Sequence, residues 1–208
     1  MDLEIAEPAP DTSLSRRSLV TRAGAAGLAG LAAALVIDRN ALASVEGTDD
    51  PQGVPTESDM VFLAEVMRIE LAASDLYLSA LPDTSDDLAA AVGLMADNHR
   101  AYAQAIAGAT GLAAGTADEE LVAEYEPAFL GSQTELLTSA HTLEQTLVAT
   151  HTELIDQLES VHALTLVASI AVIEARHATV IAHALGVDDL DVLFGNEQSA
   201  LELPGEDA

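Results

Sequence analysis

The sequence contains no cysteine, no tryptophan and no lysine. Without cysteine there is no disulfide framework, no thiolate site and no cysteine-ligated zinc site. Any bound metal must therefore depend on carboxylate and imidazole ligands, which favour iron, manganese or zinc. The chain is rich in alanine and half hydrophobic, and only 3% of its residues are aromatic. This composition favours one helical domain with a core of fair size.

Cationic residues are scarce. Seven arginines stand against 35 acidic residues, and the formal net charge is -28. Nucleic acids and anionic membrane surfaces both require a cationic partner, so neither is expected to bind this protein. The acidity also predicts self-repulsion at low salt, which about 1 M salt screens because the Debye length falls to roughly 3 Å. The acidic, lysine-free composition resembles that of proteins from extreme halophiles, so the surface is interpreted first as an adaptation to the solvent.

Residues 1–43 have the features of a twin-arginine export signal. Arg16 and Arg17 precede an apolar run at residues 23–37, and an Ala-Leu-Ala cleavage site follows at residues 41–43. As a helix this run would span about 22 Å, which is shorter than the roughly 30 Å core of a bilayer. A signal helix is therefore expected rather than a retained anchor. The protein is predicted to be exported and to lie outside the cytoplasm or at the cell surface.

A linker at residues 44–57 precedes a region in which apolar residues recur at helical spacing. This spacing predicts four long helices, at residues 58–81, 85–110, 133–158 and 161–185. Thr56 and Ser132 are each followed three residues later by an acidic residue, which favours a capping box at the start of the first and third helices. Gly186 is a natural C-cap for the fourth helix.

The lengths of the connections predict how these helices pair. Short turns join the first helix to the second and the third to the fourth, whereas residues 111–131 form a longer connection. The predicted fold is an all-α four-helix bundle, built from two helical hairpins joined by a crossover. The bundle is expected at residues 58–186, and an acidic tail follows at residues 187–208.

An E-x-x-H sequence lies in the apolar fourth helix, where Glu174 precedes His177 by three residues. At this spacing both side chains lie on one helical face and can reach a common point. A carboxylate buried there costs several kcal/mol unless it is neutralised. A metal ion held between facing helices is one way to neutralise it. The alternative is a partly solvated glutamate beside a core histidine.

The polar residues of the predicted helices form an internal repeat. Two pairs are separated by 74 residues and two by 75, namely Glu70 and Glu144, Tyr77 and His151, His99 and Glu174, and Tyr102 and His177. The chain is therefore two copies of one hairpin, with a polar pair on every helix. Polar positions that keep register on otherwise apolar faces predict a shared centre between the helices.

Residues 59–185 resemble the ferritin-like domain family. The resemblance is carried by three motifs: Glu70-(x6)-Tyr77, Glu144-(x6)-His151 and Glu174-Ala-Arg-His177. The likeness is greatest to its exported branch, which includes desiccation-related proteins. The resemblance implies a bundle with one crossover. In metal-binding members, a glutamate from each of two helices and an E-x-x-H from each of the other two hold a di-iron or di-manganese pair.

The resemblance implies a set of metal ligands in this chain. Its members are Glu70, His99, Glu144, Glu174 and His177. The second helix departs from the family pattern, because His99 and Tyr102 stand where E-x-x-H is expected. One bridging carboxylate is thus absent, which favours a single-metal or altered site over a full ferroxidase centre. Tyr77, Tyr102 and His151 are expected to orient ligands or to fill the core.

Three functions are compatible with the sequence. The first is a metal-binding ferritin-like protein that uses one or two iron or manganese ions for oxidation, oxidant removal or metal handling. The second is a metal-free bundle with a structural or stress-related role, whose glutamates form hydrogen bonds with tyrosine and histidine. The third is a module that assembles with itself or with a partner through a long helix. Whether the protein is an enzyme is left open by these alternatives.

Overall fold

The computed structural model describes residues 53–113 and 115–203. The predicted export signal at residues 1–43 lies outside the described residues, as does most of the linker. The region that follows Asp50 forms one compact unit, and the fold described below belongs to that unit.

The described part of the chain is helical and contains no strand. Four long helices dominate it: α3 (Glu57–Ala80), α4 (Asp86–Thr110), α6 (Gln133–Ile155) and α7 (Val161–Ala184). Three short ones complete it: the 3-10 turn η2 (Leu81–Asp83), α5 (Glu119–Phe129) in the crossover and α8 (Leu190–Phe194) in the tail. The predicted all-α fold is confirmed.

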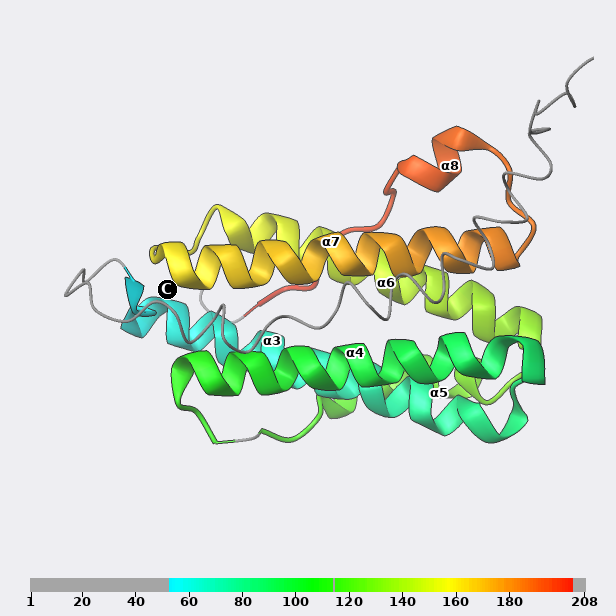
Figure 1. The fold of residues 1–208 in the computed structure, drawn as a ribbon, viewed down its shortest axis with the longest axis horizontal. Helices are drawn as coiled ribbons and strands as arrows, with labels where there is room; N and C mark the ends of the chain where they lie inside the picture. The colour runs from blue at the N-terminus through cyan, green and yellow to red at the C-terminus, as the bar shows by residue number, and fades with distance from the viewer. Residues whose placement is uncertain (1–52, 114, 204–208) are drawn as a thin grey trace, which may run out of the picture. The chain divides into compact units, whose positions relative to one another are not determined.

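The four long helices pair as two hairpins. Helix α3 packs mainly against α4, and α6 packs mainly against α7. In Figure 1, α4 (green) lies in front of α3 (cyan), and α7 (yellow to orange) lies in front of α6. The crossover helix α5 packs against α3 and α6 and so bridges the two hairpins. The result is the helical bundle that the connection lengths predicted.

The sequence signals at the helix ends act as expected. Thr56 forms a capping box with Asp59, and Ser132 forms another with Glu135. Gly186 adopts a φ of 80°, in the left-handed region that a glycine enters without steric cost. Helix α6, however, ends at Ile155 rather than at residue 158.

The early end of α6 leaves room for a contact between the two hairpins. In the turn that follows, the backbone N–H groups of Glu159 and Ser160 donate to the carboxylate of Asp59, at 2.8 and 3.0 Å. Burial works to raise the pKa of Asp59, but these bonds and one from the Thr56 N–H hold it below its ordinary value. A buried, ionised carboxylate thus links the α6–α7 turn to the start of α3.

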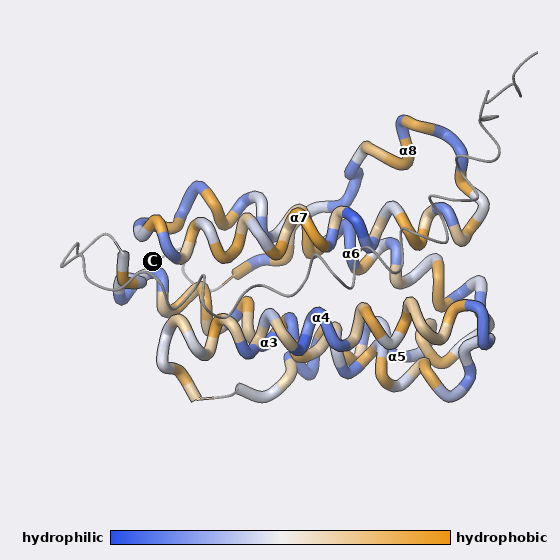
Figure 2. Tube along the Cα trace, in the orientation of Figure 1, coloured by the Kyte–Doolittle hydropathy of each residue, from blue (hydrophilic) through white to orange (hydrophobic). Residues whose placement is uncertain are grey.

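Two apolar clusters fill the bundle, one toward each end. One cluster includes Leu76, Val92, Leu143 and Ile181, and the other includes Leu63, Ile106, Leu154 and Val167. His99 on α4, His151 on α6, and Glu174 and His177 on α7 fall between the residues that these helices contribute to the two clusters, whereas Tyr77 belongs to the first cluster and Tyr102 to the second. Figure 2 shows hydrophilic stretches near the middle of α4 and α7. The candidate site is therefore a polar layer enclosed by apolar packing on both sides.

The tail after α7 packs along α6. Gln145 donates from its side chain to the Gly195 carbonyl at 3.2 Å, and the Leu201 N–H donates to Oγ1 of Thr150 at 2.9 Å. Leu203 packs against both apolar clusters. The sequence alone left open whether this tail packs or stays loose, and the structure shows that residues 195–203 pack.

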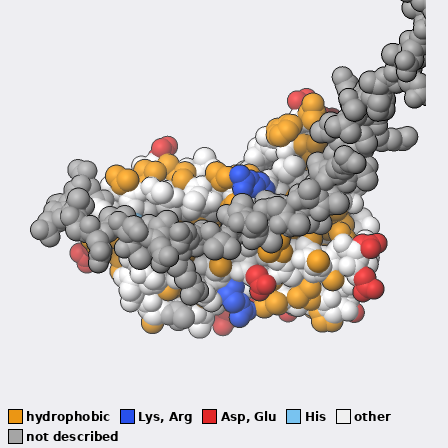
Figure 3. Space-filling model, in the orientation of Figure 1, with side chains coloured by type: hydrophobic (Ala, Val, Ile, Leu, Met, Phe, Trp, Pro, Cys, Tyr) orange, Lys and Arg blue, Asp and Glu red, His pale blue; other side chains and the backbone are white. Residues whose placement is uncertain are grey.

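Among the described helices, α7 alone is long and apolar enough to cross a membrane by length and composition. The core helix of a bundle meets the same test, and α7 directs Glu174 and His177 into the protein. Its outer face still carries exposed Val161, Leu164 and Val172. Figure 3 shows hydrophobic side chains on the visible face of the bundle.

Candidate metal centre

Six ionisable side chains meet in the polar layer. They are Glu70 on α3, His99 on α4, Glu144 and His151 on α6, and Glu174 and His177 on α7. Five of them are completely buried, and His177 is 6% exposed. All five residues predicted as metal ligands are thus brought together, and every long helix contributes at least one of them.

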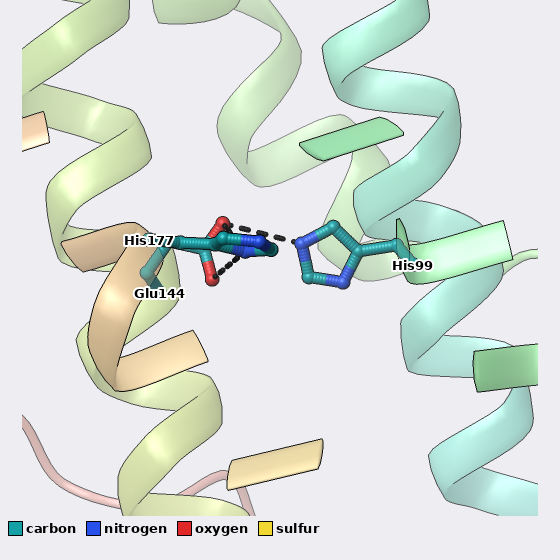
Figure 4. Close-up of side chains that lie close together, drawn as sticks. All are labelled: His99, Glu144 and His177. Atoms are coloured by element: carbon teal, nitrogen blue, oxygen red, sulfur yellow. Dashed lines mark hydrogen bonds and ion pairs between the residues drawn. The ribbon is translucent and has the colours of Figure 1, made fainter. Parts of the chain in front are cut away.

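One group of candidate ligands surrounds Glu144, as Figure 4 shows. Its Oε1 lies 3.2 Å from Nε2 of His99, and its Oε2 lies 3.3 Å from Nδ1 of His177. One ligand atom from each of the three residues lies within 4.8 Å of the others. Tyr77 also donates its hydroxyl to Oε1 of Glu144 at 2.6 Å. Glu144 therefore accepts bonds from both hairpins.

A second group surrounds Glu70 and Glu174. Glu70, Glu174 and His99 again offer ligand atoms within 4.8 Å of one another. Nδ1 of His99 lies 2.7 Å from Oε2 of Glu70, and Nδ1 of His151 lies 2.6 Å from Oε2 of Glu174. Nε2 of His151 lies 3.4 Å from Oε1 of Glu70. His99 is common to both groups, because its two ring nitrogens face different glutamates.

The pKa values of His99 and Glu144 are shifted by the side chains that face them in the layer. Burial would lower the pKa of His99, but Glu144 and Glu70 raise it well above its ordinary value. Burial would raise the pKa of Glu144, but His177 and His99 hold it far below its usual range. In the metal-free protein, an imidazolium and a carboxylate therefore lie together in the core.

Glu174 and His151 are held in their neutral forms. Burial, with the neighbouring carboxylates of Glu70 and Glu144, raises the pKa of Glu174 well above normal. Burial lowers the pKa of His151, although Glu70 acts in the opposite direction. Glu174 thus keeps a proton that a metal ion must displace, because carboxylate ligands bind metals in their ionised form.

Four buried polar atoms have no hydrogen-bond partner among residues 53–113 and 115–203. They are Oε1 of Glu70, the hydroxyl of Tyr102, Nε2 of His151 and Oε1 of Glu174. Buried polar atoms are rarely left in this way in folded proteins. The carboxylate and imidazole atoms are donors suited to iron or manganese. The residues present therefore fit a bound metal ion, both in their chemistry and in the atoms they leave free.

Two features of the site differ from what spacing suggests. Glu174 and His177 share an E-x-x-H and a helical face, yet His177 pairs with Glu144 while Glu174 pairs with His151. Asn98 was not considered as a site residue, but its amide donates to Nε2 of His177 at 3.0 Å. Its position one turn before Tyr102 on the same buried stripe was the signal that could have identified it.

The residues expected to orient ligands fall into two classes. Tyr77 and His151 contact glutamates directly, at Glu144 and Glu174 respectively. Tyr102 is buried with its ring centroid 6.1 Å from that of His99, in an edge-on arrangement. Its hydroxyl holds no ligand in place in the described structure.

Comparison with known proteins gives one match, and it agrees with this architecture. A family described as the ferritin-like domain matches residues 58–187, which are most of the chain and cover the four long helices apart from Glu57 at the start of α3. No curated protein and no solved structure was found to match. The helical fold, the two hairpins and the buried Glu/His layer fit that match. The chain belongs to the ferritin-like domain family.

Proposed function

We propose that this protein is an exported ferritin-like protein that binds iron or manganese between its four long helices, for redox or metal-handling chemistry. One observation carries the proposal: six carboxylate and imidazole side chains from all four long helices meet in a buried layer. Burying that many charged groups is unfavourable unless they are paired or bind an ion. The mixed carboxylate and imidazole donors suit either metal.

The residues of the layer have separable tasks in this proposal. Glu70, Glu144 and Glu174 would hold the ion and offset its charge, while His99 and His177 would supply nitrogen ligands. Asn98 and Tyr77 would orient His177 and Glu144 through the hydrogen bonds described above. The apolar clusters on both sides exclude bulk water. A bound iron or manganese ion would supply the capacity for electron transfer that no side chain here provides.

A metal-free bundle is the competing function, and specific contacts support it. Tyr77 satisfies one oxygen of Glu144, while His99 and His151 each satisfy an oxygen of Glu70 or Glu174. A network that served only to stabilise the fold would be expected to satisfy every buried atom. Instead, it leaves Oε1 of Glu70, Oε1 of Glu174 and Nε2 of His151 without partners in the described residues. This incomplete network favours the metal-binding function.

Export is part of the proposal, and the sequence supports it. The twin arginine at Arg16 and Arg17, the apolar run at residues 23–37 and the cleavage site occur in the order that an export signal requires. The twin-arginine pathway carries folded proteins, so a metal could be bound before export. We place the mature protein outside the cytoplasm, where the 30 acidic residues and 3 arginines that follow residue 43, a net charge of -27, suit a saline medium.

Elemental analysis of the protein exported by its native host tests the metal. The wild type is expected to contain about one or two iron or manganese ions per chain. The double variant Glu144→Ala/Glu174→Ala, which removes a carboxylate from each group, should lose them. Glu153→Ala is the matched control, because Glu153 is exposed on α6 and should leave the metal content unchanged. Circular dichroism would verify that each variant is folded.

The metal content of the wild type decides between the two functions. Absence of stoichiometric metal after export and after loading with Fe²⁺ or Mn²⁺ would contradict the proposed function. The metal-free bundle would then be the better account. Equal metal in the double variant and the wild type would place the metal elsewhere, for example on surface carboxylates.

A further inference from the structure

A small cavity lies beside the polar layer, at the end of the bundle where α4 begins and α7 ends. Its volume is about 20 Å³, and all four long helices contribute to its wall. Apart from Tyr77, its lining residues are alanine, valine, leucine, isoleucine and methionine. A void of about 10–15 Å³ already admits one water-sized molecule, and apolar voids inside proteins stay dry. The cavity is therefore suited to one small non-polar molecule.

The deep end of the cavity lies one helical turn from the candidate ligands around Glu144. On three helices, a lining residue is four positions from one of these ligands: Met95 from His99 on α4, Ala140 from Glu144 on α6, and Ile181 from His177 on α7. Four residues of an α-helix rise about 6 Å and return to the same face. A molecule in the cavity would thus lie close to ligands from three helices at once.

Tyr77 joins the cavity to the polar layer. It lines the cavity, and its ring stacks on that of His99 with the centroids 5.6 Å apart and the planes inclined by 11°. Its hydroxyl donates to Glu144 at 2.6 Å. Phe129 packs edge-on against the same ring, 5.3 Å away between centroids. The polar group that Tyr77 brings to the wall is therefore already bonded to the layer.

The lining residues lead from the polar layer to the surface between α4 and α7. At the deep end, Tyr77 and Ala140 are each only 1% exposed. At the other end, Leu88 and Val180 are partly exposed and Ala184 is exposed. Helices α4 and α7 belong to different hairpins, and they pack less extensively against each other than against their hairpin partners. The seam between them is therefore the natural entrance to the cavity.

We propose that this cavity is a binding site for dioxygen, which enters between α4 and α7 and is held one turn from the Glu144 group. Dioxygen has two heavy atoms and no charge, so it loses little on leaving water for an apolar wall. Water or hydrogen peroxide would lose hydrogen bonds that this wall does not replace. The purpose of the site rests on the proposed function, since it names the oxidant that a redox centre would receive. Binding itself requires no metal.

Nuclear magnetic resonance of the metal-free full chain under dioxygen pressure tests the site, because dioxygen is paramagnetic and speeds the relaxation of nearby methyl protons. Ile181 lines the cavity and is the reporter. Ile106 is the matched reference, because it is equally buried but belongs to the other apolar cluster. In the wild type, dioxygen should enhance the relaxation of the Ile181 methyl groups several-fold more than that of the Ile106 methyl groups.

Variants that fill the cavity should remove this difference. Ala140→Leu fills it from α6, and Ala91→Leu fills it from α4 at a partly exposed position. The second variant is needed because overpacking a buried site can cost about 1–3 kcal/mol and unfold the first. Ala90→Leu is the matched control, since Ala90 is exposed beside Ala91 and does not line the cavity. Circular dichroism would verify that each variant is folded.

The outcomes separate this inference from the proposed function. Equal enhancement at Ile181 and Ile106 in the wild type would overturn the binding site. A preference for Ile181 that persists in the folded cavity-filling variants would place dioxygen elsewhere and would also overturn it. Neither result depends on metal, because the protein tested holds none. Failure of the proposed function would instead appear as absence of metal in the elemental analysis.

Discussion

Tyr77 of the first hairpin donates its hydroxyl to Glu144 of the second over 2.6 Å. The equivalent position in the second hairpin is His151, which lies 3.4 Å from Glu70 of the first. Each hairpin thus reaches the glutamate of the other through residues that are equivalent in the repeat. The contact of Tyr77 with Glu144 is a hydrogen bond from a phenol hydroxyl. In the contact of His151 with Glu70, the imidazole nitrogen that faces the glutamate has no hydrogen-bond partner in the described structure. The two equivalent contacts therefore differ: the one to Glu144 is a hydrogen bond, and the one to Glu70 is a longer ion-pair contact.

The hydroxyls of two buried tyrosines should contribute differently to stability. Tyr77→Phe removes a bond to an ionised carboxylate, so the metal-free protein should lose about 1.5–3 kcal/mol of unfolding free energy. Tyr102→Phe removes a hydroxyl with no partner in the described residues and should be neutral or slightly stabilising. Denaturant unfolding at constant salt measures both. Equal losses in the two variants would contradict the hydrogen-bond assignment.

The metal-free protein should become less stable as the pH rises above about 7. The pKa values of His99 and Glu174 are raised in the folded state. Their contribution is present below their unfolded values of about 6.5 and 4.3 and is lost as the pH rises through the folded values. The pKa values of Glu144 and His151 are lowered, so their opposite contributions are already complete above about pH 7.

Chemical unfolding between about pH 7 and 9 at fixed salt measures this dependence. Glu174→Gln should show a weaker dependence, because the neutral amide has no proton to lose. Saturating metal should also weaken it, since the ion replaces the protons. A stability that rises with pH across this range would show that His99 and Glu174 do not have raised pKa values.

Salt should stabilise the protein strongly. A formal charge of -28 repels itself in the compact state, and this repulsion falls as the Debye length shortens from about 10 Å at 0.1 M to roughly 3 Å at 1 M. The melting temperature should therefore rise between these concentrations of NaCl. Sucrose at matched osmolality is the control for non-ionic solute effects. A melting temperature that does not respond to NaCl would contradict the halophilic interpretation of the acidic surface.

Leu203 should contribute more to stability than the exposed Phe194 of the same tail. Leu203 packs against both apolar clusters, so Leu203→Ala should lower the unfolding free energy by about 1–2 kcal/mol. Phe194→Ala removes a larger side chain that is 81% exposed and should have little effect. Thermal unfolding of the two variants makes the comparison. If Phe194→Ala were the more damaging change, the tail would pack differently from the arrangement described.

Much of the architecture was determined by the sequence alone. The spacing of apolar residues predicted all four long helices, and the capping residues Thr56 and Ser132 and the C-cap Gly186 marked their ends. These signals are local, because a cap or a helical period acts within a few residues. The repeat also predicted that polar residues of all four helices would share one layer, since positions in register on paired helices lie at the same level.

The tertiary structure alone decided which side chains pair. Helical period places Glu174 and His177 on one face, but it does not set the rotation of α7 against α6 or the side-chain rotamers. Those variables direct His177 to Glu144 and Glu174 to His151, and they bring Asn98 into the site. The path of the tail along α6 is equally non-local. It depends on contacts such as Leu201 with Thr150, which join residues 51 positions apart, and no local pattern specifies such contacts.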